Sequence, residues 1–251
     1  MTSFLQQMCK GSRRILVTGH FGSGKTEFAV SLAFALAKQK ESDPGCMKES
    51  SLALVDLDIE NPYFRSRERQ AELNAAGIAV YSDPFDGKNA SELQVISAAI
   101  LAPIQNEDCR VIADCGGDQA GARILNQFSR HFKEDYQLLS VVNCNRPGTD
   151  TVEKALQQIE DAQAVTGLRV TGLISNAHMI RYTTAEDVLQ GWSFTKQVSE
   201  RSGIPALAAC AMDSVADELG ISSAAGKTQL SGPEIFRIGM YMRESYLDKK
   251  V

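Results

Sequence analysis

The sequence lacks the features that mark membrane proteins, secreted proteins and nucleic-acid-binding surfaces. It has no apolar run of about 18 residues, so we expect no membrane-spanning helix. Its first segment, MTSFLQQMCKGSRR, contains no long apolar core, so we expect no secretory signal. Lys and Arg number 26 against 31 Asp and Glu, a formal net charge of -5, which argues against nucleic acid as a partner. A local site for a small anion remains compatible with this balance.

Closely spaced cysteine pairs are also absent. None of the six cysteines stands in the C-x-x-C spacing of a zinc knuckle or a redox pair. They are Cys9, Cys46, Cys109, Cys115, Cys144 and Cys210. We therefore expect free thiols and a cytoplasmic protein, because the cytoplasm keeps thiols reduced.

Short apolar segments alternate with helical segments along most of the 251 residues. Strands are predicted at 13–18, 51–56, 77–81, 109–113, 137–142, 168–175 and 205–210. Helices are predicted at 26–38, 64–76, 91–104, 149–165 and 184–202. Uninterrupted apolar strands fit a parallel sheet covered on both faces. We predict an α/β fold with a doubly wound, mainly parallel sheet flanked by helices.

The chain is expected to form one nucleotide-binding domain over 1–251. Its core spans about 13–210, and a helical extension spans about 211–251. The run 234–247, EIFRIGMYMRESYL, is amphipathic and predicts a terminal helix. We expect this helix to pack on the domain; binding to a membrane is the alternative.

The segment Gly19–Thr26, GHFGSGKT, fits the pattern G-x-x-x-x-G-K-[ST] between a predicted strand and a predicted helix. Gly22 and Gly24 permit backbone conformations that a side chain would block. The N–H groups of such a loop, Ser23 included, point inward and bind phosphate oxygens. Lys25 can reach the β- and γ-phosphates, and the Thr26 hydroxyl can bind Mg²⁺. The segment therefore predicts a nucleotide-phosphate site.

Acidic residues follow two other predicted strands. Asp114 begins the D-x-x-G segment that ends at Gly117, and in P-loop proteins such an Asp supports the Mg²⁺ shell. The Gly117 N–H is a candidate γ-phosphate contact. Asp56 and Asp58 stand two apart at the end of a strand, so they share one face. We interpret Asp58 as the group that orients attacking water and Asp56 as an outer metal ligand; an acidic turn without chemistry is the alternative.

Together these segments resemble the MinD/ParA-type P-loop NTPases of the SIMIBI class, over roughly residues 13–210. The segments GHFGSGKTE and VDLDIENPYFRSRE are also similar to bacterial proteins known mainly as predicted ATP-binding proteins. The resemblance implies ATP and Mg²⁺ as ligands. It implies that Asn176, at the end of the segment VTGLISN, contacts adenine. It assigns nucleotide binding to Gly22, Ser23, Gly24, Lys25, Thr26, Gly117 and Asn176, the metal site to Thr26, Asp56 and Asp114, and catalysis to Lys25 and Asp58.

One position departs from that class. Its members carry a signature lysine at the second loop position, which reaches the phosphates of a dimer partner. This chain has His20 there, whose side chain is shorter than that of lysine. Arg65, Arg67 and Arg69 are candidate replacements; a solvated helix face paired with nearby glutamates is the alternative. The resemblance still allows for a homodimer.

Two smaller signals lie elsewhere in the chain. The segment after the strand 137–142 carries Asn145 and Arg146, which either contact nucleotide or belong to a turn capped by Thr149 or Asp150. His131 and His178 are isolated, and we do not expect them to bind a ligand.

Three functions fit these signals. The first is a Mg²⁺-dependent ATPase with slow turnover that acts as a nucleotide switch on a protein partner. The second is an ATP-dependent enzyme that activates a small carboxylate, in the manner of dethiobiotin synthetase or cobyrinic acid amide synthase. The third is a module that holds nucleotide without hydrolysing it.

Overall fold

A computed structural model of the chain describes residues 3–58, 69–82, 98–117, 119–132, 135–224 and 232–242. Its strands are β1 (Arg14–Thr18), β2 (Ser51–Leu57), β3 (Ile78–Ser82), β4 (Cys109–Cys115), β5 (Gln137–Val142), β6 (Gly172–Ser175), β7 (Ala206–Ala211) and β8 (Ile235–Arg237). Its helices are α1 (Phe4–Lys10), α2 (Lys25–Ser42), α3 (Gln70–Ala75), α4 (Ala98–Gln105), α5 (Gln119–Phe132), α6 (Val152–Thr166), α7 (Ala185–Ser202) and α8 (Asp213–Ala224).

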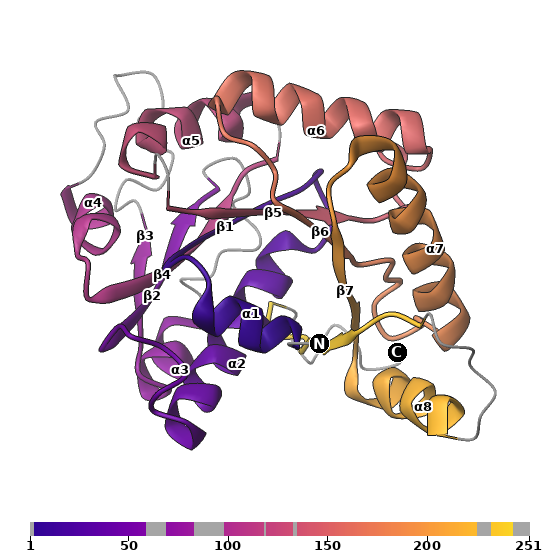
Figure 1. Cartoon of the computed structure of the whole chain (residues 1–251), viewed down its shortest axis with the longest axis horizontal. Helices are drawn as coiled ribbons and strands as arrows, with labels where there is room; N and C mark the ends of the chain where they lie inside the picture. The colour runs from indigo at the N-terminus through magenta and orange to yellow at the C-terminus, as the bar shows by residue number, and fades with distance from the viewer. Residues whose placement is uncertain are drawn as a thin grey trace, which may run out of the picture.

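The eight strands form one parallel sheet in the order β3-β2-β4-β1-β5-β6-β7-β8. Strand β4 is buried along its whole length, as expected of a strand covered on both faces. One hydrophobic core packs α1 and α2 against one face of the sheet, and a second packs α4, α5, α6 and α7 against the other. Figure 1 shows the two layers around the sheet. The predicted doubly wound α/β fold is confirmed.

The order of the strands places the predicted site. Strand β1 lies between β4 and β5, and β4 lies between β1 and β2. The carboxyl ends of these strands meet at one edge of the sheet, where open α/β sheets bind ligands. The loop after β1, the acids at the end of β2 and the Asp at the end of β4 therefore meet there.

Helix α1 was not predicted from the sequence. It begins at a Ser3 capping box, in which the Ser3 and Gln6 side chains pair with each other's backbone N–H groups. Its Phe4 packs edge-on against Phe236 of β8, with ring centroids 5.4 Å apart, and 6.3 Å from Phe28 of α2. The two ends of the described chain thus pack against the helix that follows β1.

The terminal helix predicted over 234–247 was wrong for its described part. Residues 235–237 form the edge strand β8, which extends the sheet beside β7. The residues from 243 onward lie outside the described residues. The spacing of apolar residues suggested a helix because a three-residue strand is too short to show the alternation of a strand.

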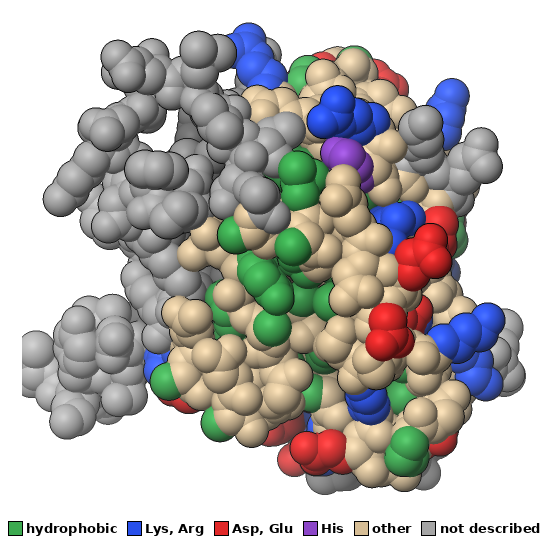
Figure 2. Space-filling view, turned by 90° about the vertical axis from the view of Figure 1, so that its left-hand side faces the viewer, with side chains coloured by type: hydrophobic (Ala, Val, Ile, Leu, Met, Phe, Trp, Pro, Cys, Tyr) green, Lys and Arg blue, Asp and Glu red, His purple; other side chains and the backbone are tan. Residues whose placement is uncertain are grey.

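The described surface mixes both signs of charge. On the side of the molecule that carries α4 and the β3 edge, Figure 2 shows hydrophobic side chains in the middle of the face and side chains of both charges beside them. Among the described residues, no helix combines the length and the apolar composition that crossing a membrane requires.

Candidate functional site

The loop between β1 and α2 has the backbone that its glycines predict. Gly22 and Gly24 adopt φ values of 72° and 86°, in the left-handed region that favours glycine. Gly24 is the N-cap of α2 and provides no side-chain cap. The first N–H groups of α2 are thus available to an anion, which the partial positive charge of the helix end favours.

Neighbouring residues cover this loop closely. A Cβ on Gly22 would lie 3.2 Å from the Arg146 Nε atom, and a Cβ on Gly24 would overlap the Asn176 side chain. A Cβ on Gly117 would overlap the Gly19 carbonyl oxygen, so the D-x-x-G turn also rests on this loop. Backbone conformation thus favours glycine at Gly22 and Gly24, and close approach requires it at Gly24 and Gly117.

The three predicted acids come together beneath the loop. Asp56 and Asp114 are paired in register on the neighbouring strands β2 and β4. The Thr26 hydroxyl donates to Asp114 Oδ2 at 2.6 Å, and Lys25 Nζ forms a buried ion pair with Asp58 Oδ2. The Asp58 N–H donates to Asp56 Oδ1 at 3.1 Å. The sequence-predicted cluster is therefore one connected network.

Burial and charge shift the pKa values of this network in opposite directions. Burial lowers the pKa of Lys25, but the carboxylates of Asp114 and Asp58 outweigh it and raise that pKa, so the ammonium stays charged. Burial raises the pKa of Asp114 to about 6, against the opposing effects of Lys25 and Thr26. A cation placed beside Asp114 would relieve this cost.

The donor set fits Mg²⁺ bound together with phosphate. Asp114 Oδ1 is buried and has no hydrogen-bond partner in the described part of the chain. Within the described residues, no three His, Cys, Asp or Glu side chains form a metal site by themselves. Mg²⁺ typically takes one or two carboxylates and completes its octahedron with phosphate oxygens and water. Thr26 and Asp114 could supply the protein's part of such a shell.

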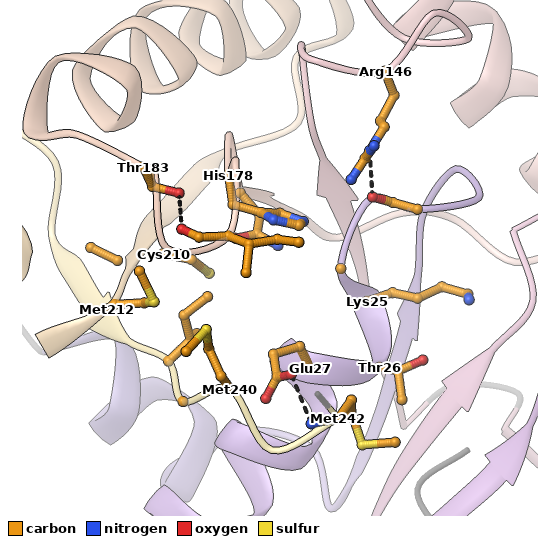
Figure 3. A pocket seen from close by; sticks show the side chains of 17 residues that line it. Lys25, Thr26, Glu27, Arg146, His178, Thr183, Cys210, Met212, Met240 and Met242 are labelled. Carbon is orange, nitrogen blue, oxygen red and sulfur yellow. Dashed lines mark hydrogen bonds between the residues drawn. The ribbon is translucent and has the colours of Figure 1, made fainter. Parts of the chain in front are cut away.

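A cavity of about 220 Å³ opens beside the loop and continues away from Lys25 and Thr26. Four segments line the rest of it: the turn after β5, the turn after β6, the end of β7, and the chain after β8. Figure 3 shows His178 and Met240 pointing into the cavity from opposite sides, with Cys210 and Met212 on the side away from Lys25. Its largely apolar lining with a few polar groups is typical of a small-molecule site.

Three polar side chains connect this cavity to the loop. Asn176 Nδ2 donates to the Ser23 carbonyl at 2.8 Å, and the buried Asn176 Oδ1 has no partner in the described structure. Arg146 Nε donates to the Gly22 carbonyl at 2.7 Å (Figure 3). Burial, followed by the charge of Arg146, lowers the pKa of His178 to about 4, so its imidazole is neutral. Arg146 and His178 thus both line the site. The sequence offered Arg146 as a possible nucleotide contact, but it gave His178 no ligand-binding role.

A second cavity, of about 410 Å³, lies on the other side of the loop. Its lining includes His20, Gly117, Lys154 and Gln158. The Gln158 amide donates to the Gly117 carbonyl at 3.4 Å, so helix α6 contacts the D-x-x-G turn. His20 packs against Gly148 and faces this cavity.

Other predictions near the site had different outcomes. Arg69 pairs with Glu72 at 3.0 Å and donates to the Tyr241 carbonyl, which matches the paired-helix alternative. Arg65 and Arg67 lie outside the described residues. The N-cap of α6 is Thr151, which accepts from the Lys154 N–H, so the predicted caps Thr149 and Asp150 were wrong. Thr149 is buried instead and donates to the Asn143 carbonyl.

The chain matches no known family and is similar to some solved structures. No family model matches the chain, and no curated protein matches it. Among solved structures, the chain is similar to the signal recognition particle receptor FtsY from Elizabethkingia anophelis, with 18% identity and a TM-score of 0.44. It is also similar to cell division protein ftsY from Thermotoga maritima, with 18% identity and a TM-score of 0.47. These matches cover 82% of this chain, and the chain spans 63% and 67% of those proteins, respectively.

Proposed function

We propose that the chain binds Mg-ATP at the loop between β1 and α2 and hydrolyses it slowly, as a nucleotide switch for a protein partner. The observation that carries this proposal is the convergence of one cation, one hydroxyl and three acids beneath a glycine loop. Lys25, Thr26, Asp56, Asp58 and Asp114 come from three separate segments and form one network. Such a network is costly to bury without a ligand that uses it.

The proposed phosphate contacts follow from the loop. The N–H groups from Gly22 to Thr26 would hold the phosphates, and Lys25 would exchange Asp58 for a phosphate oxygen. This exchange would free the Asp58 carboxylate to orient a water molecule toward the γ-phosphate. Gly117, which rests on the loop, would sense the γ-phosphate through its N–H group. Loss of that phosphate would release the turn, as in other nucleotide switches.

Mg²⁺ would be held by Thr26 and Asp114, with Asp56 in the outer shell. When bound, it would neutralise charge on the phosphate oxygens. The chain's own contribution is to keep Asp114 buried and hydrogen-bonded to Thr26, which fixes the direction of both ligands.

Adenine is the base that the cavity supports best. The Asn176 amide is oriented by its donation to Ser23, which leaves its oxygen as an acceptor without a described partner. The exocyclic amino group of adenine is a donor, whereas the corresponding group of guanine is an acceptor. No K-x-D segment, the usual guanine-reading pattern, follows Asn176.

A hydrolysis assay with point variants tests the proposed function. We expect Mg-dependent ATP turnover in the wild type, loss of binding and turnover in Lys25→Ala, and binding without turnover in Asp58→Ala. Lys38→Ala, on the same helix, is the matched control and should behave as the wild type. Equal, measurable ATP turnover in wild type and Asp58→Ala would contradict the role of Asp58. Binding without turnover in the wild type would leave only a nucleotide-holding module.

The second cavity supports an alternative, an enzyme that uses ATP to activate a small carboxylate. It adjoins Gly117, and its lining includes Lys154, whose ammonium pairs with Asp150 at 2.7 Å. ATP turnover that appears only when a carboxylate substrate is added would favour this alternative. Turnover that a protein partner stimulates, without any carboxylate, would favour the switch.

A further inference from the structure

The chain after β8 forms one wall of the apolar cavity. Ile238, Met240 and Met242 line it opposite the turn that carries His178. The segment 238–242 contains no helix or strand of its own. The Ile238 N–H donates to the Ala211 carbonyl at 2.9 Å, and this bond fixes only the start of the segment. Something else must fix its remainder.

Glu27 of α2 makes the contacts that hold this remainder. Its Oε1 atom accepts from the Tyr241 N–H at 2.6 Å, and its Oε2 atom accepts from the Met242 N–H at 3.0 Å. One turn further along α2, the Ser31 hydroxyl accepts from the Gly239 N–H at 3.1 Å. The Phe34 ring stacks on Tyr241 with centroids 4.6 Å apart. Helix α2 thus binds the segment through three backbone N–H groups and one ring.

The position of Glu27 links this wall to the phosphate loop. Glu27 directly follows Thr26, and both line the same cavity. A carboxylate enclosed at this position is costly unless its oxygens are hydrogen-bonded, and both Glu27 oxygens accept a backbone N–H here. A half-buried carboxylate that accepts from two N–H groups is a specific device for fixing a chain segment.

We propose that Glu27 is a positioning residue that holds segment 238–242 as a wall of the nucleoside pocket. The inference rests on the proposed function, because it assigns the apolar cavity to the nucleoside of the bound nucleotide. Glu27 itself touches no phosphate in this account. It holds the backbone N–H groups of Tyr241 and Met242, and this keeps the side chains of Met240 and Met242 against the base and ribose.

Separate measurement of nucleoside binding and phosphate binding tests the proposal. Mg-ATP and Mg-tripolyphosphate are titrated into wild type, Glu27→Gln, Glu27→Ala and Ser31→Ala. We expect Glu27→Gln and Glu27→Ala to weaken Mg-ATP binding about tenfold or more, because a charged acceptor of two hydrogen bonds is lost. Tripolyphosphate binding should stay within about twofold. Hydrolysis should show a raised KM with kcat unchanged.

Controls separate this role from a general loss of structure. Glu41→Gln removes an exposed carboxylate from the same helix and should change neither affinity. Ser31→Ala should weaken Mg-ATP binding in the same direction by a smaller factor, and it keeps the test available if the Glu27 variants do not fold. Equal weakening of both ligands, or unchanged Mg-ATP binding in Glu27→Gln, would overturn the role of Glu27. A wild type that binds neither ligand would instead overturn the proposed function.

Discussion

At the scale of single residues, opposed charges are held in place before any ligand arrives. Lys25 forms a buried ion pair with Asp58, and the Thr26 hydroxyl donates a hydrogen bond to Asp114. A phosphate that replaces Asp58 at Lys25 exchanges one anion for another, so the ammonium is never left unpaired in a buried place. This explains how the chain can keep a buried ammonium and three carboxylates under one loop.

His178 carries a prediction about pH. Its pKa of about 4 lies below the usual 6.5, so the unfolded chain binds a proton at a higher pH than the folded chain. The contribution of His178 to the free energy of unfolding is therefore fully present above pH 6.5. It is lost as the pH falls toward 4, by at most about 1.4 kcal/mol per pH unit. Urea denaturation of wild type and His178→Gln at several pH values measures this.

The variant should show a flatter dependence of unfolding free energy on pH than the wild type between pH 6.5 and 4. His131→Gln should flatten the dependence less, because burial and the charges of Arg130 and Arg14 lower the pKa of His131 by a smaller amount. Parallel curves for wild type and His178→Gln would show that His178 is not held neutral by burial.

At the scale of elements, buried polar side chains tie the helices to the ends of the strands. Arg110 in β4 is 2% exposed and pairs with Glu49 at 3.0 Å. It also donates to the carbonyls of Met8 and Ser12, at the end of α1 and just after it. One guanidinium therefore holds the N-terminal helix, the loop before β2 and the start of β4 together.

Replacement of Arg110 should be costly. Arg110→Ala would leave the Glu49 carboxylate and two carbonyls without their donor, and we expect a loss of about 3–5 kcal/mol in the free energy of unfolding. Arg201→Ala, which breaks the exposed pair with Glu153, should cost far less, because solvent screens that pair. Chemical denaturation of both variants measures the difference, and equal losses would refute the structural role of Arg110.

The elements also show what could be predicted from sequence. The loop glycines, Lys25, Thr26 and the acids were predictable because each follows a recognisable apolar strand. Glu27 and His178 were not, because their roles depend on contacts with segments 214 and 154 residues away, respectively. For Arg146 the sequence left a nucleotide contact and a turn open, and only its contact with Gly22 places it at the loop. Strand β8 was missed because three residues are too few to show a period.

At the scale of the whole molecule, the proposed ligand joins parts that lie far apart in the chain. The cavity is lined from α2, from the turns after β5 and β6, from β7 and from the chain after β8. A nucleotide that contacts all of them would stabilise the fold as a unit. Phe4, Phe28 and Phe236 already connect α1, α2 and β8 below this region.

Thermal unfolding tests this stabilisation. At a concentration one hundred times its Kd, Mg-ATP should add about 2.7 kcal/mol to the free energy of unfolding. For a domain of this size, that raises Tm by several degrees. Scanning calorimetry should show the shift in wild type and in Lys38→Ala and none in Lys25→Ala. A shift of equal size in Lys25→Ala would place the ligand away from the loop.

We propose that the glycine loop and the apolar cavity form one site for Mg-ATP. Titration calorimetry of the wild-type chain with Mg-ATP and with Mg-GTP tests it most directly. We expect one site per chain, tighter binding of Mg-ATP than of Mg-GTP, and no binding of either nucleotide by Lys25→Ala. Absence of Mg-ATP binding to the folded wild-type chain would contradict it.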